Sequence, residues 1–356
     1  TGSLMMGGRL GEALVGVLSA LIGRFHGGPA QVGVMSSTLF GGVSGSAVAD
    51  ASAIGSLMIP WHRRLGYPPA FSAATLAAAA TIDILIPPSI PMILFALSAN
   101  ASIAALFVAG IVPGLLMCAG FMGVCWWVGR RRGFPRDTTP FAWPAFRRHL
   151  LYASPALLLP VLIIVFLRLG IATPTEVAVL STLYAGLVSA VVYRDLGWRR
   201  LNDAVVHAGL ATGVVLLVIM ASAAIGWLLT FDRMPDGIVQ WVQSHVHSAW
   251  LVIVLMNLLM LFIGMFIDLP AAVLLLTPVF VPLAQSIGMD MTQLGIMMVV
   301  NLALGLYTPP VGTTLFITSS LARVKVGQTV RELIPFYLVA LAVLALVSYV
   351  PASILR

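Results

Sequence analysis

Hydroxyl groups and glycines gather in one short segment of otherwise apolar sequence. The run from Gly41 to Asp50 reads GGVSGSAVAD and contains Ser44, Gly45 and Ser46. Backbone that leaves the helical path in an apolar medium is tolerated only where it is buried in protein or lines a wet cavity. Free carbonyls and hydroxyls are hard oxygen donors that suit a small cation such as Na+, whereas helix N-termini beside the turn would favour an anion. The segment is a candidate cation or substrate site, with close packing of small residues as the alternative.

Two proline-rich segments could supply further backbone oxygens. Asp83 precedes ILIPPSIP at 84–91, where three prolines within five residues remove backbone donors and free the carbonyls of the preceding turn. The segment GLYTPPVGTT at 305–314 has the same Pro-Pro pair. Its hydroxyls and glycines, which could approach a ligand, are Gly305, Thr308, Gly312, Thr313 and Thr314. The alternative is a pair of structural kinks, which is common for one proline and much less so for matched Pro-Pro breaks.

Three acids lie within or beside these apolar segments: Asp50, Asp83 and Asp268, the last in GMFIDLP at 264–270. Because burying an acid in a membrane is costly, such acids are functional by default. Asp50 and Asp268 could instead cap helices near turns. No acid stands in a metal or nucleotide motif and the sequence has no Walker A phosphate loop, so ATP hydrolysis by this chain is not expected.

The chain carries a copy of its own helix-breaking residues. A shift of 222 residues, without any gap, places Gly42 on Gly264 and the pair Pro87-Pro88 on Pro309-Pro310. The same shift places Pro60 on Pro282, Gly66 on Gly288, Ser98 on Ser320 and Pro113 on Pro335. Paired hydrophobic segments that are interrupted by Gly or Pro are the best sequence pointer to the binding site of a transporter. We therefore predict a secondary transporter.

Composition indicates that the solvent of this chain is lipid. Hydrophobic residues make up 60% of the chain and charged residues 9%, against about 45–50% and about 25% in soluble domains. The net charge of +7 does not indicate nucleic-acid binding, because the basic residues lie in short loops between apolar runs. Cys118 and Cys125 share one apolar run without partners at ligand spacing, so they imply neither a disulfide framework nor a metal site.

Apolar runs of about 20 residues are long enough to cross a bilayer. Uninterrupted runs fall at 103–128, 151–168, 173–193, 204–231 and 331–355. Four further regions are broken near their middle by Gly, Pro or small polar residues: 29–60, 69–99, 249–284 and 291–321. We interpret 29–60 and 249–284 as re-entrant hairpins, and the other two as discontinuous helices.

Charge asymmetry gives the orientation. The arginine-rich loop from Arg130 to Arg148 is expected in the cytoplasm by the positive-inside rule, and counting spans then places Asp232 and Asp236 outside. One hairpin thus enters from the cytoplasm and its copy from the opposite side, so the repeats are inverted.

The predicted organisation has three parts. These are a first inverted repeat at 1–128, a basic loop with scaffold helices at 129–203, and a second inverted repeat at 204–356. Amphipathic stretches at 10–22 and 232–242, which match under the same shift, are predicted to be arm helices that lead into the hairpins.

The motifs resemble the large membrane subunit of tripartite ATP-independent periplasmic (TRAP) transporters of the C4-dicarboxylate (DctM) type, over essentially the whole chain. The most specific matches are FGGVSGSAVADASAIGSLMIP at 40–60, ILIPPSIPM at 84–92, GIATPTEVAVLSTLYAGL at 170–187, GMFIDLPAAVLLLTPVFVPLA at 264–284 and GLYTPPVGTTLF at 305–316. The resemblance implies an all-α polytopic protein of the bacterial inner membrane, an elevator-type transporter and not an enzyme. It also implies sodium-driven uptake of a small organic acid with two partners, a small four-helix TRAP membrane subunit and a periplasmic substrate-binding protein.

The resemblance also implies particular sites. One sodium site would use Ser44 and Ser46 with carbonyls around Ile84 and Pro87. The other would use Gly264, Gly305, Thr308 and Gly312. The substrate is expected between the two hairpin tips, with candidate contacts at Ser44, Gly45, Ser46, Asp50, Ser89, Asp268, Thr313 and Thr314. Sodium here is a transported ion and not a catalytic cofactor.

The sequence departs from the family pattern at Asp83, where related sequences more often have Gly. This acid could tighten a cation site, accept a proton, or face away from both. Related large subunits usually begin with additional scaffold helices, so a further N-terminal portion is expected. The small subunit is expected as a separate chain or within that portion.

Other functions stay open. A standalone sodium- or proton-coupled carboxylate carrier of related elevator fold would need no binding protein. An intramembrane enzyme, for instance an aspartyl protease, would use the buried aspartates, but Asp50 and Asp268 do not coincide under the repeat. A pure scaffold would leave the polar breaks at membrane depth unexplained. The pattern does not identify which organic acid is carried.

Overall fold

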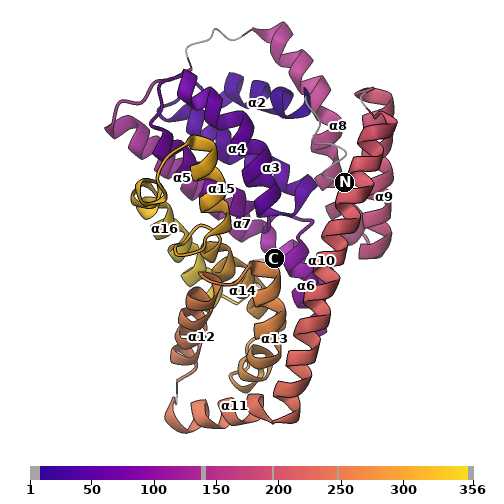
Figure 1. Cartoon of the computed structure of the whole chain (residues 1–356), viewed down its shortest axis with the longest axis vertical. Coiled ribbons are helices and arrows are strands. Elements are labelled where there is room, and N and C mark those ends of the chain that lie inside the picture. The colour runs from indigo at the N-terminus through magenta and orange to yellow at the C-terminus, as the bar shows by residue number, and fades with distance from the viewer. Residues whose placement is uncertain (1–8, 138–141, 195, 247, 352–356) are drawn as a thin grey trace.

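The computed structural model describes residues 9–137, 142–194, 196–246 and 248–351. These residues form helices joined by short turns, with no strand among them (Figure 1). The predicted all-α fold is therefore confirmed for this part of the chain. Residues 1–8 of the first predicted repeat and 352–355 of the last predicted span lie outside the described residues.

The helices before and after the central region correspond one to one. The first set is α2 (Arg9–Ile22), α3 (Gly28–Ser44), α4 (Ala47–Arg64), α5 (Pro69–Ala79), α6 (Ile90–Ala99) and α7 (Ile103–Arg131). The second set is α11 (Met234–His245), α12 (Ala249–Gly264), α13 (Leu269–Ser286), α14 (Met291–Gly305), α15 (Thr313–Ala322) and α16 (Val326–Tyr349). A shift of 222 residues carries both ends of α4 onto the ends of α13, so the repeat of the helix breakers is also a repeat of helices.

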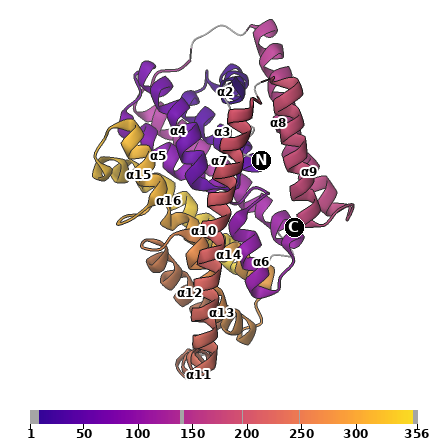
Figure 2. The ribbon, with the colours of Figure 1, turned by 45° about the vertical axis from the view of Figure 1, so that its right-hand side comes forward.

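Three helices connect the two sets. They are α8 (Trp143–Arg168), α9 (Pro174–Leu187), which continues as a π-helical turn at Val188–Val192, and α10 (Trp198–Phe231). In Figure 1, α10 runs along the side of the molecule past both sets, and Figure 2 shows α8 and α9 standing beside the first set.

Six of the described helices are long and apolar enough to cross a membrane. They are Ile103–Arg131, Trp143–Leu167, Pro174–Val192, Trp198–Leu228, Leu269–Ser286 and Val326–Tyr349. Five of them correspond to the predicted uninterrupted spans. The last is α16, which begins at Val326 and ends at Tyr349, both earlier than the limits of the predicted 331–355, and Pro335 lies inside it. Leu269–Ser286 is one limb of the predicted hairpin 249–284, so length and hydropathy alone do not distinguish a hairpin limb from a span.

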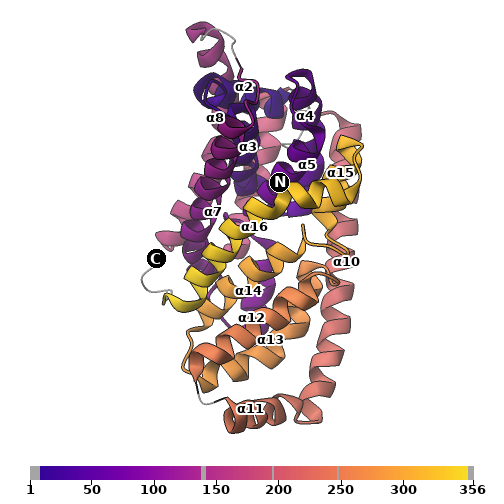
Figure 3. The same cartoon turned by 90° about the vertical axis from the view of Figure 1, so that its left-hand side faces the viewer.

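The two hairpins point toward each other from opposite ends of the molecule. The arm helices α2 and α11 lie at the two ends, with the pair α3/α4 and the pair α12/α13 between them (Figures 1 and 3). We call the segments at 83–89 and 306–312, which interrupt the helices, the first and the second break. The short helix after each break packs on the other set: α6 packs on α13 and α14, and α15 packs on α4 and α5. This exchange brings both breaks to the centre. The division at 128 and 204 stays a prediction.

Candidate substrate and ion site

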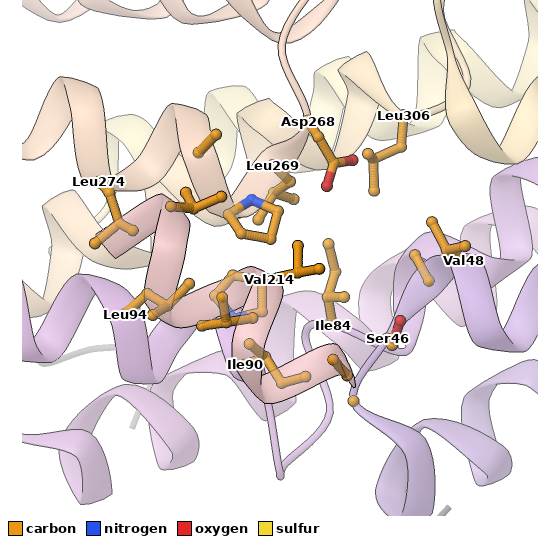
Figure 4. A pocket seen from close by; sticks show the side chains of 18 of the residues that line it. Ser46, Val48, Ile84, Ile90, Leu94, Val214, Asp268, Leu269, Leu274 and Leu306 are labelled. Atoms are coloured by element: carbon orange, nitrogen blue, oxygen red, sulfur yellow. The ribbon is translucent and has the colours of Figure 1, made fainter. Parts of the chain in front are cut away.

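The two hairpin tips line one cavity of about 640 Å³. The first tip contributes Gly45, Ser46, Ala47 and Val48, and the second contributes Asp268, Leu269, Pro270 and Ala271. In Figure 4, Ser46 and Asp268 lie on opposite sides of this space, with Ile84 and Val214 between them. Segments more than 200 residues apart in sequence are therefore neighbours at the centre of the fold.

Local sequence places a helix N-terminus at each side of this cavity. Gly45 adopts a left-handed conformation (φ 68°), which ends α3, and Ser46 caps α4 by accepting a hydrogen bond from the N–H of Ala49. Asp268 stands directly before α13, where Pro270 lies in the first turn. The unpaired N–H groups of a helix start carry partial positive charge. Two such starts beside one cavity make it suited to an anionic group.

The first hairpin tip is hydrogen-bonded to a buried carboxylate. Asp83 is fully buried, and its two oxygens accept the backbone N–H groups of Gly45 and Ser46, each at 3.0 Å. The Ser44 hydroxyl and the Asp50 carboxylate are close enough to interact with it electrostatically. A Cβ on Gly41 would lie 2.7 Å from the Asp83 Cα, so glycine at this position admits the break that carries Asp83. Asp83 therefore faces the tip.

The rest of the first break forms hydrogen bonds within itself and packs closely on the tip. The Ser89 hydroxyl donates to the Ile84 carbonyl at 2.5 Å and caps α6 by accepting from the N–H of Met92. A Cβ on Gly45 would lie 2.4 Å from the Pro88 carbonyl oxygen, which shows how closely the tip packs on the break. The peptide bond between Pro87 and Pro88 is cis, as is the matching bond between Pro309 and Pro310.

The second tip packs on its break through backbone alone. A Cβ on Gly305 would lie 2.2 Å from the Gly264 carbonyl oxygen, so this position requires glycine, whereas a Cβ on Gly264 would come no closer than 3.2 Å, to the Leu302 Cδ2. The N–H of Val311 donates to the Met265 carbonyl at 3.2 Å. A small cavity of about 10 Å³ lies here, about the least space that holds one water molecule. It is lined by Gly264, Met265, Phe266, Ile267, Asp268, Gly305, Leu306, Val311, Gly312 and Thr313.

The predicted site residues fall into three groups. Gly45, Ser46, Ile84 and Asp268 line the central cavity. The second group, which lines the small cavity at the second tip, consists of Gly264, Gly305, Gly312, Thr313 and again Asp268. The remaining predicted residues line neither cavity: Ser44, Asp50, Asp83, Pro87, Ser89, Thr308 and Thr314. Their roles as ligands stay predictions.

Two of the remaining threonines hold the second break together. The Thr308 hydroxyl donates to the Leu304 carbonyl at 2.6 Å. Thr314 is fully buried, and its hydroxyl lies within hydrogen-bonding distance of the Ala77 carbonyl in α5 and the Leu306 carbonyl. Thr314 thereby joins the break of one half to the helix of the other.

One wall of the central cavity was not predicted from the sequence. Residues of α10 form it, namely His207, Leu210, Ala211, Val214, Val215 and Val218. The sequence pattern predicts an ordinary span at 204–231, because its apolar run has no break. The one available signal was His207, a polar side chain near the start of that run.

A polytopic membrane protein whose two sets of interrupted helices meet at a central cavity is built as a transporter and not as an enzyme. Residues 1–353 match the family model of the tripartite ATP-independent periplasmic transporter, DctM component. The chain belongs to this family, the large permease components of TRAP transporters, which are multi-pass proteins of the inner membrane.

Three relatives illustrate the similarity. An uncharacterized protein y4mL of Sinorhizobium fredii is 56% identical over 99% of this chain and 84% of its own length. The C4-dicarboxylate TRAP transporter large permease protein DctM of Pseudomonas aeruginosa is 36% identical over 99% of this chain and 82% of its own length. The isethionate TRAP transporter permease protein DctMQ of Oleidesulfovibrio alaskensis is 37% identical over 99% of this chain and 55% of its own length.

Proposed function

We propose that this chain carries a small organic acid across the inner membrane, driven by sodium, by an elevator-type movement of the domain that holds the hairpin tips. The observation that carries the proposal is the convergence of both tips, each with a helix N-terminus, on one central cavity.

The cavity favours a small anion. Its volume of about 640 Å³ lies in the range of about 300–1,000 Å³ that small-molecule sites occupy. The starts of α4 and α13 supply positive potential without a cationic side chain from either tip. Two relatives with named substrates, a C4-dicarboxylate and isethionate, also carry organic anions. Most of the lining is apolar, so charge at the tips and the size of the cavity would together select the substrate.

A sodium ion fits the second tip. Glycines at 264, 305 and 312 line the small cavity without side chains, and backbone carbonyls are hard ligands of the kind a small cation prefers. Asp268 lines both this cavity and the central one. Its carboxylate would attract the cation and repel an anionic substrate that arrives without it. Such an arrangement couples the two sites, typically by about 1–3 kcal/mol.

The first tip would bind a cation differently. The matching position of Gly305 holds Asp83, whose carboxylate is already bonded to the N–H groups of the tip. A cation near Ser44, Ser46 and the Ile84 carbonyl would therefore lie beside this buried acid. At the second tip the nearby acid is Asp268. We propose that both tips bind sodium, with Asp83 raising the affinity at the first.

The proposed partners are those of the family. TRAP large permeases work with a small membrane subunit and a periplasmic substrate-binding protein, and the DctMQ relative joins the two membrane components in one chain by its printed name. We propose the same assembly for this chain, with a four-helix small subunit. A standalone carrier is the alternative.

The test is uptake into proteoliposomes that contain the full-length protein with its small subunit. We expect uptake of a radiolabelled C4-dicarboxylate to require an inward sodium gradient and the binding protein together. Ser46→Ala and Thr308→Ala should lower the response to sodium, and Ser52→Ala, an exposed hydroxyl on the outward part of α4, serves as the matched control. Uptake driven equally well by choline with a proton gradient would contradict sodium coupling. Uptake without the binding protein would favour the standalone carrier.

A further inference from the structure

A second cavity, of about 520 Å³, lies between α7 and α16 and shares no residue with the cavities at the hairpin tips. We call it the α7–α16 groove. It is lined by Trp127, Val128, Arg131, Arg132, Ile334, Pro335 and Leu338. The α7 residues 127, 128 and 131 share one helix face, as do the α16 residues 334, 335 and 338. Two facing helix stripes therefore form the walls.

Contacts at its two ends delimit the groove. At one end α7 and α16 approach closely, because a Cβ on Gly120 would lie 2.3 Å from the Val339 Cγ1. At the other end, Arg132 and Glu332 form an ion pair at 2.8 Å. Between these contacts the side walls are apolar and exposed: Trp127 is 50% exposed and Leu338 66%. An exposed apolar surface of a membrane protein meets lipid.

The end of the groove that carries the ion pair is basic. The Arg131 guanidinium lies over the Trp127 ring at 5.3 Å and forms no ion pair within the described part of the chain. Arg331 lies one helical turn from Ile334 and Pro335, on the same face of α16. Glu332 is the single acid that α7 and α16 carry, and Arg132 already pairs with it. Arg131 and Arg331 therefore leave a net positive charge at this end.

Charge counting places that end of both helices at the cytoplasmic face, where tryptophan and arginine side chains commonly meet the lipid headgroups. Basic pockets between membrane helices on this side bind anionic headgroups. We propose that the α7–α16 groove binds a phospholipid with an anionic headgroup. One acyl chain would lie along Trp127, Ile334 and Leu338, and the phosphate would be bound by Arg131.

Charge complementarity and the shape of the lining favour a lipid over other occupants. A free phosphate would contact only the basic end and would leave the apolar length unfilled. An extended polypeptide segment would bring backbone N–H and C=O groups for which the lining side chains offer few partners. A membrane helix satisfies its own backbone groups and could fill the apolar length, but it would leave Arg131 without an anion unless it carried an acid there. An amphiphile with an anionic end and an apolar tail satisfies both parts.

The chain offers a matched pair of variants. Arg130 lies over the Trp126 ring at 5.5 Å, in the same kind of contact, but neither residue lines the groove. The full-length protein, purified in detergent, is titrated with phosphatidylglycerol, and bound lipid is counted by native mass spectrometry. Phosphatidylcholine of the same chain length and glycerol 3-phosphate alone are titrated in parallel.

We expect phosphatidylglycerol to bind more tightly than phosphatidylcholine. Arg131→Gln should weaken phosphatidylglycerol binding about fivefold, the effect of one basic residue at a lipid surface. Arg131→Lys should retain most of the binding, and Arg130→Gln should not change it. Both arginines are exposed, so these variants are expected to fold, which the thermal unfolding midpoint checks.

Several outcomes would overturn the proposal. Equal losses in Arg130→Gln and Arg131→Gln would show a diffuse surface attraction. Equal binding of phosphatidylcholine would reduce the site to ordinary contact with the bilayer. If Arg131→Gln weakened the binding of glycerol 3-phosphate as much as that of phosphatidylglycerol, the ligand of the site would be a soluble phosphate. Displacement of bound phosphatidylglycerol by the small membrane subunit would make the occupant a protein.

Discussion

The Asp83 carboxylate accepts the backbone N–H of Gly45 at 3.0 Å, and the position that matches Asp83 in the second half of the chain is Gly305. The two halves thus join tip to break in different ways. In the first half a side chain bonds to the tip, whereas in the second half Gly305 lets the backbone of the break lie directly against Gly264. The following predictions use this difference.

Asp83→Asn should destabilise the first hairpin. The amide keeps the volume of the side chain but removes its charge and one acceptor, so one tip N–H loses its partner. Hydrogen bonds to charged groups contribute about 1.5–3 kcal/mol. We expect a loss of about 2 kcal/mol in the free energy of unfolding, measured as a lower thermal unfolding midpoint in detergent. Asp203→Asn, an exposed acid on α10, should leave the midpoint unchanged, and equal midpoints for both variants would refute the role of Asp83.

Gly305→Ala should force the second tip away from its break. The added Cβ would lie 2.2 Å from the Gly264 carbonyl oxygen, so backbone must move. Overpacking of this kind costs about 1–3 kcal/mol, and we expect a lower midpoint together with loss of uptake. Gly213→Ala on α10 is the control, because a Cβ there meets nothing within 4 Å. If the two alanine variants behave alike, the close approach at Gly305 has no functional importance.

Asp268→Asn should raise the sodium requirement of uptake without unfolding the protein. This carboxylate lines both the central cavity and the small cavity at the second tip. Removing its charge should raise the sodium concentration for half-maximal uptake about tenfold, because that factor corresponds to about 1.4 kcal/mol of lost attraction. Sodium titration of uptake in proteoliposomes measures it. Asp232→Asn, an exposed acid just after α10, is the control. An unchanged sodium requirement in Asp268→Asn would exclude this acid from coupling.

The predicted orientation can be tested at the two ends of α10. Arg199 lies in the first turn of this helix, Asp232 directly follows it, and both are exposed. A cysteine at 232 should react with a membrane-impermeant maleimide added to spheroplasts, and a cysteine at 199 should react only after the membrane is opened. The native Cys118 and Cys125 are buried, so background labelling should be low. The reverse pattern would invert the whole topology.

Much of the architecture was accessible from the pattern of helix breakers. Gly45, Pro87-Pro88 and Pro309-Pro310 predicted where helices end, because left-handed backbone and missing N–H donors act locally. The limits of α16 were predicted less well, because the apolar run at 331–355 leaves out the polar first turns of the helix, which begins at Val326.

The sequence by itself determined that this chain is an all-α membrane protein of the TRAP large permease family, with matched breaks in two halves. Those features depend on hydropathy and on residues that act within one turn of chain. Only the tertiary structure decided that Asp83 faces the first hairpin tip and that Asp268 borders two cavities. It also showed that His207 and Val214 of α10 belong to one wall of the central cavity. These relationships depend on packing between segments distant in sequence, and the exchange of α6 and α15 between the halves sets that packing.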